Sequence, residues 1–337
     1  MLIKQALLED EIYKIILFLE ENNLKYDEDI VETYYIEEFD KIIGSISRSK
    51  DIIKALAVDI DYRGENIANI LVSEVMNSMR YNNVYHFQVY TKTEYEVVFT
   101  SMGFNTLAKT EKVCILESGN PSIEIEIQKM KLQIEKRFHI DVLEHSIGAI
   151  VVNCNPITLG HYHLIEEASK KHEYFIVLVV EEDQSIFSFK ERFSLIYLAL
   201  TSFENIIILP STQYIVSALT FPSYFLKSLD EVEKEHAKLD AIIFKNYFMK
   251  SLNIRKRYIG SETTSVMVMY NSILKEILKD KINIQERFKF KKEIISASLV
   301  RKLIFENKIN EAMTFVPEQI KSVFEKMAKE KYEQSVR

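Results

Sequence analysis

Short apolar runs alternate with helix-like apolar spacings through the second half of the chain. Residues 147–152 are apolar and predict a strand buried on both faces of a sheet, and from residue 160 onward apolar positions recur at intervals of three and four, which predicts a helix. Regular alternation of strands and helices is typical of a doubly wound parallel sheet. Further elements of this kind are expected as strands at 174–180, 205–209 and 239–244 and as helices at 189–203 and 225–236.

The first half of the chain follows a different order. Adjacent runs at 33–39 and 41–48 predict a hairpin, so this half is not a simple alternation of strands with helices. We therefore expect an α+β domain ahead of the parallel sheet. Its other expected elements are an edge strand at 2–6, a helix at 9–20, a strand at 52–58, a helix that runs to Met79 and a strand at 84–90.

A cluster of turn-forming residues separates the two patterns. Ser118, Gly119, Asn120 and Pro121 follow one another, and the mixed charge of residues 122–139 then suits a bridging helix. We expect one domain at 1–118, a linker and bridging helix at 119–145, and a second domain at 146–337.

Polar residues suited to phosphate binding follow the strand at 147–152. Thr158-x-Gly160-His161 opens the next helix, and ligands of open α/β sheets bind where a strand ends and a helix begins. Gly160 would let a phosphate approach the backbone, and His161 and Thr158 can donate hydrogen bonds to its oxygens. Taken alone, this tetrapeptide favours the plainer alternative, in which His161 merely begins a helix.

A second segment near the C-terminus changes that balance. Residues 295–301 read Ile-Ser-Ala-Ser-Leu-Val-Arg, and Ser296 can cap a helix whose early residues Ser298 and Arg301 point toward whatever its N-terminus binds. Arg301 suits a polyphosphate, because its charge is permanent and its fork can hold two oxygens.

Together these motifs resemble the HxGH nucleotidyltransferase superfamily and, within it, the citrate lyase ligase family. The pattern is a strand followed by Asn-Pro-x-Thr-x-Gly-His, with Ile-Ser-Ala-Ser-x-x-Arg on the order of one domain length later. Other segments that carry the same resemblance lie at 180–183, 187–192, 214–217, 220–227 and 257–262.

The resemblance implies an AMP-forming ligase that uses ATP. Acetate would attack the α-phosphate, and the acetyl group would pass to the dephospho-coenzyme A derived thiol on the acyl carrier subunit of citrate lyase, which activates the lyase. It implies His161 at the α-phosphate, Thr158 as a supporting donor, and Arg301 with Ser296 and Ser298 at the departing pyrophosphate. Mg²⁺ would bridge the phosphates and keep several waters, so we expect no dedicated carboxylate cage.

For several residues near strand ends, the sequence leaves open whether they contact the nucleotide. Asn153 and Asn155 fit nucleotide contact and simple turn closure about equally. Arg257 precedes Gly260 at another expected strand end, where contact with adenine or phosphate is conceivable.

Three further segments are left with two interpretations each. Residues 181–183 could orient Mg²⁺-bound water or form a solvated loop. His163 should face another side of the helix from His161, which favours a structural role. Tyr214 and residues 217–224 suggest an acyl pocket or lid only through the family resemblance.

The first half resembles a GNAT acetyltransferase, whose Arg/Gln-x-x-Gly-x-Gly/Ala loop binds the pyrophosphate of coenzyme A at a helix N-terminus. Arg63, Asn66 and Ala68 occupy that pattern. Asn66 replaces a glycine; it tolerates a left-handed backbone but narrows the approach of a phosphate. Phe99 stands where many GNAT enzymes have a proton-donating tyrosine, which fits transfer toward a thiol, since the thiol must lose a proton. A module used only for docking is the alternative.

The overall composition is that of an ordinary soluble chain. Its 337 residues are 47% hydrophobic and 28% charged, which suits two globular domains. The net charge is −7, so no overall basic field exists to drive nonspecific binding of nucleic acid or anionic membrane. Local clusters of basic residues lie at 245–257 and 287–292. We interpret them as solvated surface, and a docking site for an acidic partner is the alternative.

Cysteine usage and the N-terminal sequence indicate a cytoplasmic protein. Cys114 and Cys154 lie far apart and form neither a disulfide framework nor a metal-ligand cluster. Cys154 lies inside the phosphate turn, where it suits a space-filling role better than a nucleophilic one. The N-terminus is charged too early for a secretory signal, and no apolar run is long enough for a membrane span.

Two other classes of function remain open from the sequence. One is a nucleotidyltransferase that joins a nucleotide to a phosphorylated acceptor such as phosphopantetheine, which leaves the first domain unexplained. The other is a non-catalytic nucleotide-binding regulator, for which Thr158 and Asn66 would be signs of decay. The products distinguish the three: pyrophosphate with AMP for the ligase, pyrophosphate with a nucleotide conjugate for the transferase, and neither for the regulator.

Overall fold

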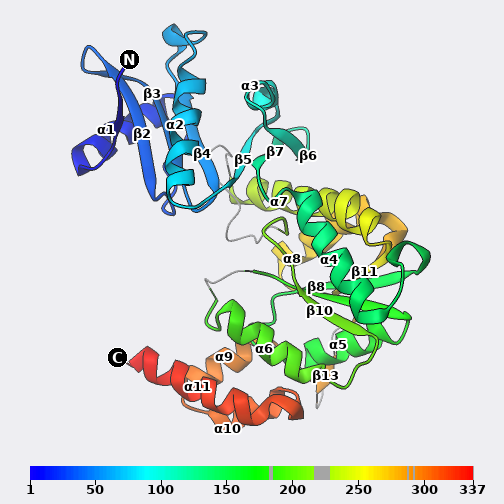
Figure 1. Ribbon diagram of the computed structural model, residues 1–337. Helices are drawn as coiled ribbons and strands as arrows, with labels where there is room; N and C mark the ends of the chain where they lie inside the picture. The colour runs from blue at the N-terminus through cyan, green and yellow to red at the C-terminus, as the bar shows by residue number, and fades with distance from the viewer. Residues whose placement is uncertain (182–184, 216–227, 287, 291–292, 337) are drawn as a thin grey trace. The chain divides into compact units, whose positions relative to one another are not determined.

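The computed structural model describes residues 1–181, 185–215, 228–286, 288–290 and 293–336 (Figure 1). The chain forms two compact units. Unit 1 comprises Met1–Ile125 and Ala218–Ile243, and unit 2 comprises Glu126–Ser217 and Phe244–Arg337. The chain therefore passes between the units three times.

Unit 1 is built on a seven-stranded mixed sheet in the order β1-β2-β3-β4-β5-β7-β6. Its central feature is the pairing of β4 with β5, which is parallel and confined to Ile52–Gln88 and Ile53–Val89. No other residues of β4 and β5 are paired with each other, so the two strands diverge beyond these positions. The strands are β1 (Ile3–Gln5), β2 (Glu32–Glu38), β3 (Lys41–Arg48), β4 (Ile52–Val58), β5 (His86–Lys92), β6 (Asn105–Lys109) and β7 (Val113–Gly119).

Among the described residues, four α-helices lie wholly in unit 1. They are α1 (Glu9–Glu21), α2 (Ile67–Tyr81), α3 (Glu96–Ser101) and α7 (Leu229–Ile243). The apolar face of α2 closes the core through Leu71, Val75 and Met79, all fully buried. Helix α7 packs against β6 and β7, where the Thr110 hydroxyl donates to the Glu235 carboxylate and Lys112 pairs with Glu231.

Unit 2 is built on a five-stranded parallel sheet in the order β10-β9-β8-β11-β12. The first strand of the unit is thus central, and the chain order reverses between β8 and β11, which is where open α/β sheets bind ligands. The strands are β8 (Ile147–Val152), β9 (Tyr174–Val179), β10 (Ile206–Pro210), β11 (Ile254–Gly260) and β12 (Ile282–Gln285). A two-stranded hairpin of β13 (Lys289–Phe290) and β14 (Glu293–Ile294) follows.

Helices lie on both sides of this sheet, with α5 and α6 on one side and α8 on the other (Figure 1). One large core joins α5, α6, α9 and α11 to β8 and β9, with Phe187 stacked on Phe324. The helices are α4 (Ile123–Phe138), which begins in unit 1, then α5 (Leu159–Ser169), α6 (Phe189–Ala199), η4 (Phe244–Met249, a π-helix), α8 (Ser265–Leu278), α9 (Ala297–Phe305), α10 (Ile309–Ala312) and α11 (Lys321–Val336).

The doubly wound parallel sheet and the preceding α+β unit are confirmed, and most predicted elements lie within a few residues of those observed. The strand predicted at 239–244 is wrong, because these residues continue α7 and enter η4. A short apolar run fits a buried strand and a buried helix equally well. The hairpin of β6 and β7 went unpredicted, and residues 218–243 join unit 1 although the sequence assigned them to the second domain.

Within the part of the chain that the structure describes, no helix is long and apolar enough to cross a membrane.

Candidate functional site

The turn after β8 is held by a buried arginine of α6. Arg192 is fully buried and donates to the main-chain oxygens of Asn153 at 2.9 Å, Val180 at 3.0 Å and Phe187 at 3.2 Å. It thereby ties the carboxyl end of β8 to that of β9. From the sequence, residues 187–192 carry only a family resemblance, although an arginine among the apolar positions of a helix is a signal that could have identified this anchor.

Thr158 and His161 form a capping box at the start of α5. The Thr158 main-chain N–H donates to His161 Nδ1 at 3.2 Å, and Thr158 Oγ1 lies 3.0 Å from the same nitrogen and accepts from the His161 N–H at 3.4 Å. A main-chain N–H can only donate, so Nδ1 must accept. A neutral His161 ring therefore carries its proton on Nε2, and Nε2–H is the donor that the ring offers.

The C-terminal motif lies beside this turn. Arg301 of α9 donates to the Asn155 main-chain oxygen at 2.6 Å and to Ser298 Oγ at 3.2 Å. A Cβ added to Gly160 would lie 3.5 Å from the main-chain oxygen of Ile295, the residue before the cap Ser296. The structure thus brings together two segments that are far apart in the sequence.

Burial affects the two ionisable groups of this turn in different ways. Partial burial lowers the pKa of the Arg301 guanidinium from its ordinary value, and an arginine side chain nevertheless keeps its charge in proteins near neutral pH. Burial raises the pKa of the Cys154 thiol far above its ordinary value. Cys154 is 2% exposed, which fits the space-filling role expected for it.

The remaining residues of the turn divide into structural and accessible groups. Asn155 Oδ1 accepts from the Phe187 N–H at 3.1 Å, so its side chain closes the turn. Asn153 is exposed at the end of β8 and Ser298 is exposed in the first turn of α9. Ser296 Oγ accepts from the Leu299 N–H at 3.1 Å and caps α9 as predicted.

Arg257 does not lie at the turn, in contrast to the contact considered for it. Its side chain is 2% exposed, lies over the Phe244 ring at 4.4 Å and donates to the Tyr270 hydroxyl at 3.3 Å. Its backbone pairs with Ala149 in the middle of β8, so it belongs to the interior of unit 2. Gly260, at the carboxyl end of β11, does lie beside α5, since an added Cβ would be 3.6 Å from Leu164 Cδ2.

One group of potential metal ligands lies on α5 among the residues described. His163, Glu166 and Glu167 have donor atoms close together, but Lys170 pairs with Glu166 at 3.2 Å and with Glu167 at 2.9 Å. This arrangement is a surface ion-pair network, and His163 takes part in it through Glu166 at 3.7 Å. Of the carboxylates predicted near β9, Glu181 is exposed, and residues 182–184 lie outside the described residues. Residues 217–224 of the expected acyl pocket or lid also lie outside the described residues.

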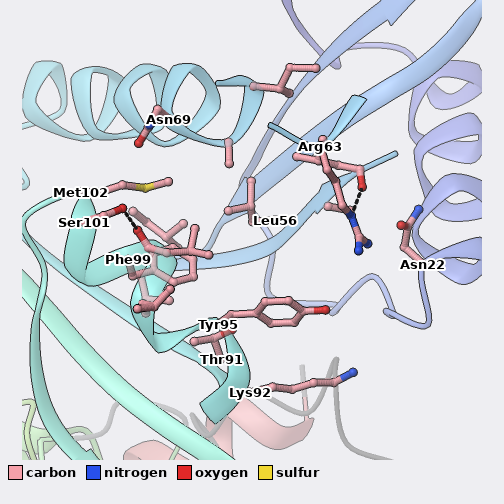
Figure 2. A pocket seen from close by; sticks show the side chains of 18 of the residues that line it. Asn22, Leu56, Arg63, Asn69, Thr91, Lys92, Tyr95, Phe99, Ser101 and Met102 are labelled. Atoms are coloured by element: carbon pink, nitrogen blue, oxygen red, sulfur yellow. Dashed lines mark hydrogen bonds between the residues drawn. The ribbon is translucent and has the colours of Figure 1, made fainter. Parts of the chain in front are cut away.

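Unit 1 contains a cavity of about 670 Å³ where β4 and β5 part. Figure 2 shows Leu56, Tyr95 and Phe99 on its walls. Phe99 is 4% exposed and packs edge-on against Phe104, so an apolar ring stands where the proton donor was considered.

The loop at the start of α2 forms another side of this cavity. Gly64 and Asn66 adopt left-handed backbone conformations with φ of +94° and +65°, which glycine adopts readily and asparagine tolerates better than most residues. No side chain caps α2, because Asn66 Oδ1 accepts instead from Asn69. Arg63 donates to the Val58 main-chain oxygen at 3.4 Å, and Ala68 lies in the first turn.

Each half of the chain matches the model of a known protein family. Residues 147–323 match the family model of the citrate lyase ligase C-terminal domain, and residues 15–114 match that of an acetyltransferase (GNAT) domain. The first of these covers more than half of the chain.

The chain belongs to the citrate lyase ligase family. A [citrate [pro-3S]-lyase] ligase of Haemophilus influenzae is 32% identical over 89% of this chain and 91% of its own length. That of Escherichia coli (strain K12) is 29% identical over 90% of this chain and 87% of its own length. A solved GNAT-family acetyltransferase from Staphylococcus aureus aligns with 36% of this chain and 100% of its own length, at 15% identity and a TM-score of 0.30.

Membership of this family identifies the chain as an enzyme of the ligase class, which sets aside a non-catalytic regulator. The matched C-terminal domain contains all five strands of the parallel sheet together with the Thr158–His161 turn and Arg301. It also contains α7, although α7 packs in unit 1.

Proposed function

We propose that this enzyme joins acetate to ATP in unit 2, releasing pyrophosphate, and passes the acetyl group to a thiol on the acyl carrier subunit of citrate lyase, releasing AMP. The observation that carries the proposal is the meeting of the Thr158–His161 turn with Arg301 at the switch point of the sheet. An oxygen-rich anion placed there would meet a helix N-terminus, an imidazole N–H and a guanidinium.

His161 is the residue assigned to the α-phosphate. An acetate oxygen attacks phosphorus, the bond from phosphorus to the bridging oxygen breaks, and negative charge builds on the phosphate oxygens. The Nε2–H of a neutral His161 can donate to one of these oxygens without gaining or losing a proton. Thr158 is 1% exposed, so we assign it to positioning His161 rather than to direct contact with ATP.

Arg301 and Ser298 are assigned to the departing pyrophosphate. Arg301 is fixed by the Asn155 carbonyl at 2.6 Å and keeps its charge, and fixed donors stabilise charge that develops during reaction. Ser296 contributes by capping α9, since its hydroxyl accepts from the Leu299 N–H. The start of α9 lies beside the turn, because the Ile295 main-chain oxygen is 3.5 Å from a Cβ added at Gly160. Asn153, Gly160 and Gly260 border the space for the nucleotide.

Mg²⁺ is assigned to the phosphates of ATP, where it would offset their charge. It binds phosphate oxygens and keeps several waters, so it needs few protein ligands. This suits a turn whose described donors are N–H groups and cations. Of the described carboxylates, the exposed Glu181 after β9 is the one we assign to a Mg²⁺-bound water.

The cavity of unit 1 is assigned to the thiol arm of the carrier. Arg63, Asn66 and Ala68 would hold its pyrophosphate at the uncapped start of α2, and the apolar walls would hold the chain that ends in sulfur. Sulfur attacks the acetyl carbon, the bond to the AMP oxygen breaks, and the thiol loses its proton. Phe99 fits this direction, since no proton donor to sulfur is needed.

The enzyme is assigned to the cytoplasm. Its two cysteines, Cys114 and Cys154, are both free, which suits a reducing compartment.

The first experiment is acetate-dependent exchange of labelled pyrophosphate into ATP by the full chain with Mg²⁺. We expect exchange that requires acetate and falls at least a hundredfold in His161→Ala, a loss of about 2.7 kcal/mol of transition-state stabilisation. His163→Ala is the matched control, because His163 lies in the surface ion-pair network. Exchange that is absent with every short carboxylic acid, despite ATP binding, would contradict the proposal.

A further inference from the structure

A lysine is buried in the wall of the unit 1 cavity. Lys54 of β4 is 2% exposed and is one of the residues that line the cavity. Its ammonium nitrogen lies 2.6 Å and 2.8 Å from the two carboxylate oxygens of Asp29 and 3.1 Å from Asp27 Oδ2. Removing a charge from water is costly unless partners compensate it, and the two carboxylates supply that compensation. Lys54 is therefore fixed in the wall by two residues of the segment between α1 and β2.

The place of Lys54 in β4 is the narrow end of the cavity. Lys54 follows Ile53, the last residue of β4 that pairs with β5, and the two strands diverge from there. The proposed function places the pyrophosphate of the thiol arm at the start of α2. Val58, whose carbonyl accepts from Arg63, is at the other end of β4 from Ile53. The part of β4 between Lys54 and Val58 spans about 13 Å or less, so an arm that extends along the cavity brings its sulfur toward Lys54.

The segment that Lys54 holds forms another part of the cavity wall. Asn22 and Leu24, at its start, line the cavity (Figure 2). Its main chain is weakly attached to the rest of unit 1. From residue 25 to residue 30, the main-chain hydrogen bond formed with a described residue stays within the segment and runs from the Ile30 N–H to the Asp27 carbonyl at 3.3 Å.

Side chains attach this segment to the sheet. Asp27 and Asp29 reach β4 through Lys54, and the Tyr26 hydroxyl lies 2.9 Å from Thr33 Oγ1 of β2. Among these contacts, the ion pairs with Lys54 are the ones made directly to a cavity-lining residue of the sheet. The position of this part of the wall therefore depends on Lys54.

We propose that Lys54 is a positioning residue for the transfer step: by holding Asp27 and Asp29, it fixes residues 22–29 as a wall against which the thiol arm lies. This inference rests on the proposed function, in which the arm enters the cavity of unit 1. Buried ion pairs are often no more stabilising than apolar side chains of similar volume, so the contribution of this cluster is a fixed geometry. A wall that is already ordered lowers the entropy lost when the arm binds.

The test variant is Lys54→Met, which keeps an unbranched side chain and removes the charge. Asp27 and Asp29 then lose the cation that holds them, and the two carboxylates repel each other. We expect KM for the carrier thiol and Kd for free dephospho-coenzyme A both to rise about tenfold. Trypsin should cleave faster after the exposed Lys25, because the segment loses its attachment to β4. Acetate-dependent pyrophosphate exchange reports unit 2 and should keep its wild-type rate.

Two further variants separate positioning from stability. Lys4→Met is the matched control, because Lys4 forms an exposed ion pair with Glu37 at 2.7 Å and does not line the cavity. Lys54→Met/Asp27→Asn/Asp29→Asn removes all three charges. It should recover the thermal stability of the wild type and still bind dephospho-coenzyme A about tenfold more weakly, because no ion pair holds the segment.

Binding within twofold of wild type in Lys54→Met, or an equal loss in Lys4→Met, would overturn the inference. Recovery of both stability and binding in the triple variant would overturn it as well, since the ion pairs would then serve stability alone. If Lys54→Met does not fold or loses exchange, the triple variant takes its place with the same expected loss of binding. If the wild type exchanges pyrophosphate but does not acetylate the carrier, the proposed transfer step fails, while binding of dephospho-coenzyme A still tests the wall.

Discussion

At the scale of single residues, Thr158 sets the orientation of the His161 ring, to which we assign the contact with the α-phosphate. Thr158 meets His161 Nδ1 through both its main-chain N–H and its hydroxyl. The sequence predicted the two residues as parallel donors to phosphate, because the motif alone does not reveal that Thr158 is buried. Because Thr158 is only 1% exposed, we expect it to affect the reaction by positioning His161.

Thr158→Val should lower kcat/KM for acetate-dependent exchange about tenfold, corresponding to roughly 1.4 kcal/mol. The change keeps the shape of the side chain but removes the hydroxyl that caps α5 and faces Nδ1. Thr158→Ser keeps the hydroxyl and should retain most activity. The ¹⁵N shifts of His161 report the tautomer directly, so a Val variant with unchanged shifts and full activity would contradict the positioning role.

At the scale of elements, the parting of β4 from β5 creates the cavity of unit 1. Both strands were predicted, but their divergence after Ile53 and Val89 was not, because apolar alternation specifies the face of a strand and not its neighbours. The α2 loop was predicted more fully, since glycine and asparagine are the residues that tolerate positive φ.

Leu56→Trp should fill the cavity from β4 and lower acetylation of the carrier thiol at least tenfold. Pyrophosphate exchange should be unchanged, because the phosphate turn belongs to unit 2. Leu17→Trp on α1 is the matched control, as Leu17 is 43% exposed and does not line the cavity. Wild-type acetylation by Leu56→Trp would show that the thiol arm does not enter this cavity.

At the scale of the whole molecule, the two units share the chain in an unexpected way. Helix α7 belongs by sequence to the ligase domain and by packing to the GNAT-like unit, where Glu235 accepts from Thr110. Within α7, Ala237 and Ala241 are fully buried. We therefore expect that cutting the chain at the linker separates α7 from the strands it packs against.

A fragment of residues 146–337 should be less stable than the full chain, because it retains α7 but lacks β6 and β7. We expect a thermal midpoint lowered by several degrees, or about 4 °C for each 1 kcal/mol lost, and binding of a hydrophobic dye that the full chain does not bind. Thr110→Val in the full chain, which removes one contact to α7, should give a smaller decrease. A fragment as stable as the full chain would contradict this account.

The sequence by itself determined the types of most elements, the two fold classes, the turn at the end of β8 and the distribution of charge. These depend on local spacing, on backbone preferences and on composition, which are all present in the order of residues. Tertiary structure alone decided that Arg301 meets Asn155, that Arg192 anchors the turn, that Arg257 is interior and that α7 joins unit 1. Each of these depends on partners distant in the chain, and local pattern specifies which face of an element is apolar without specifying what covers it.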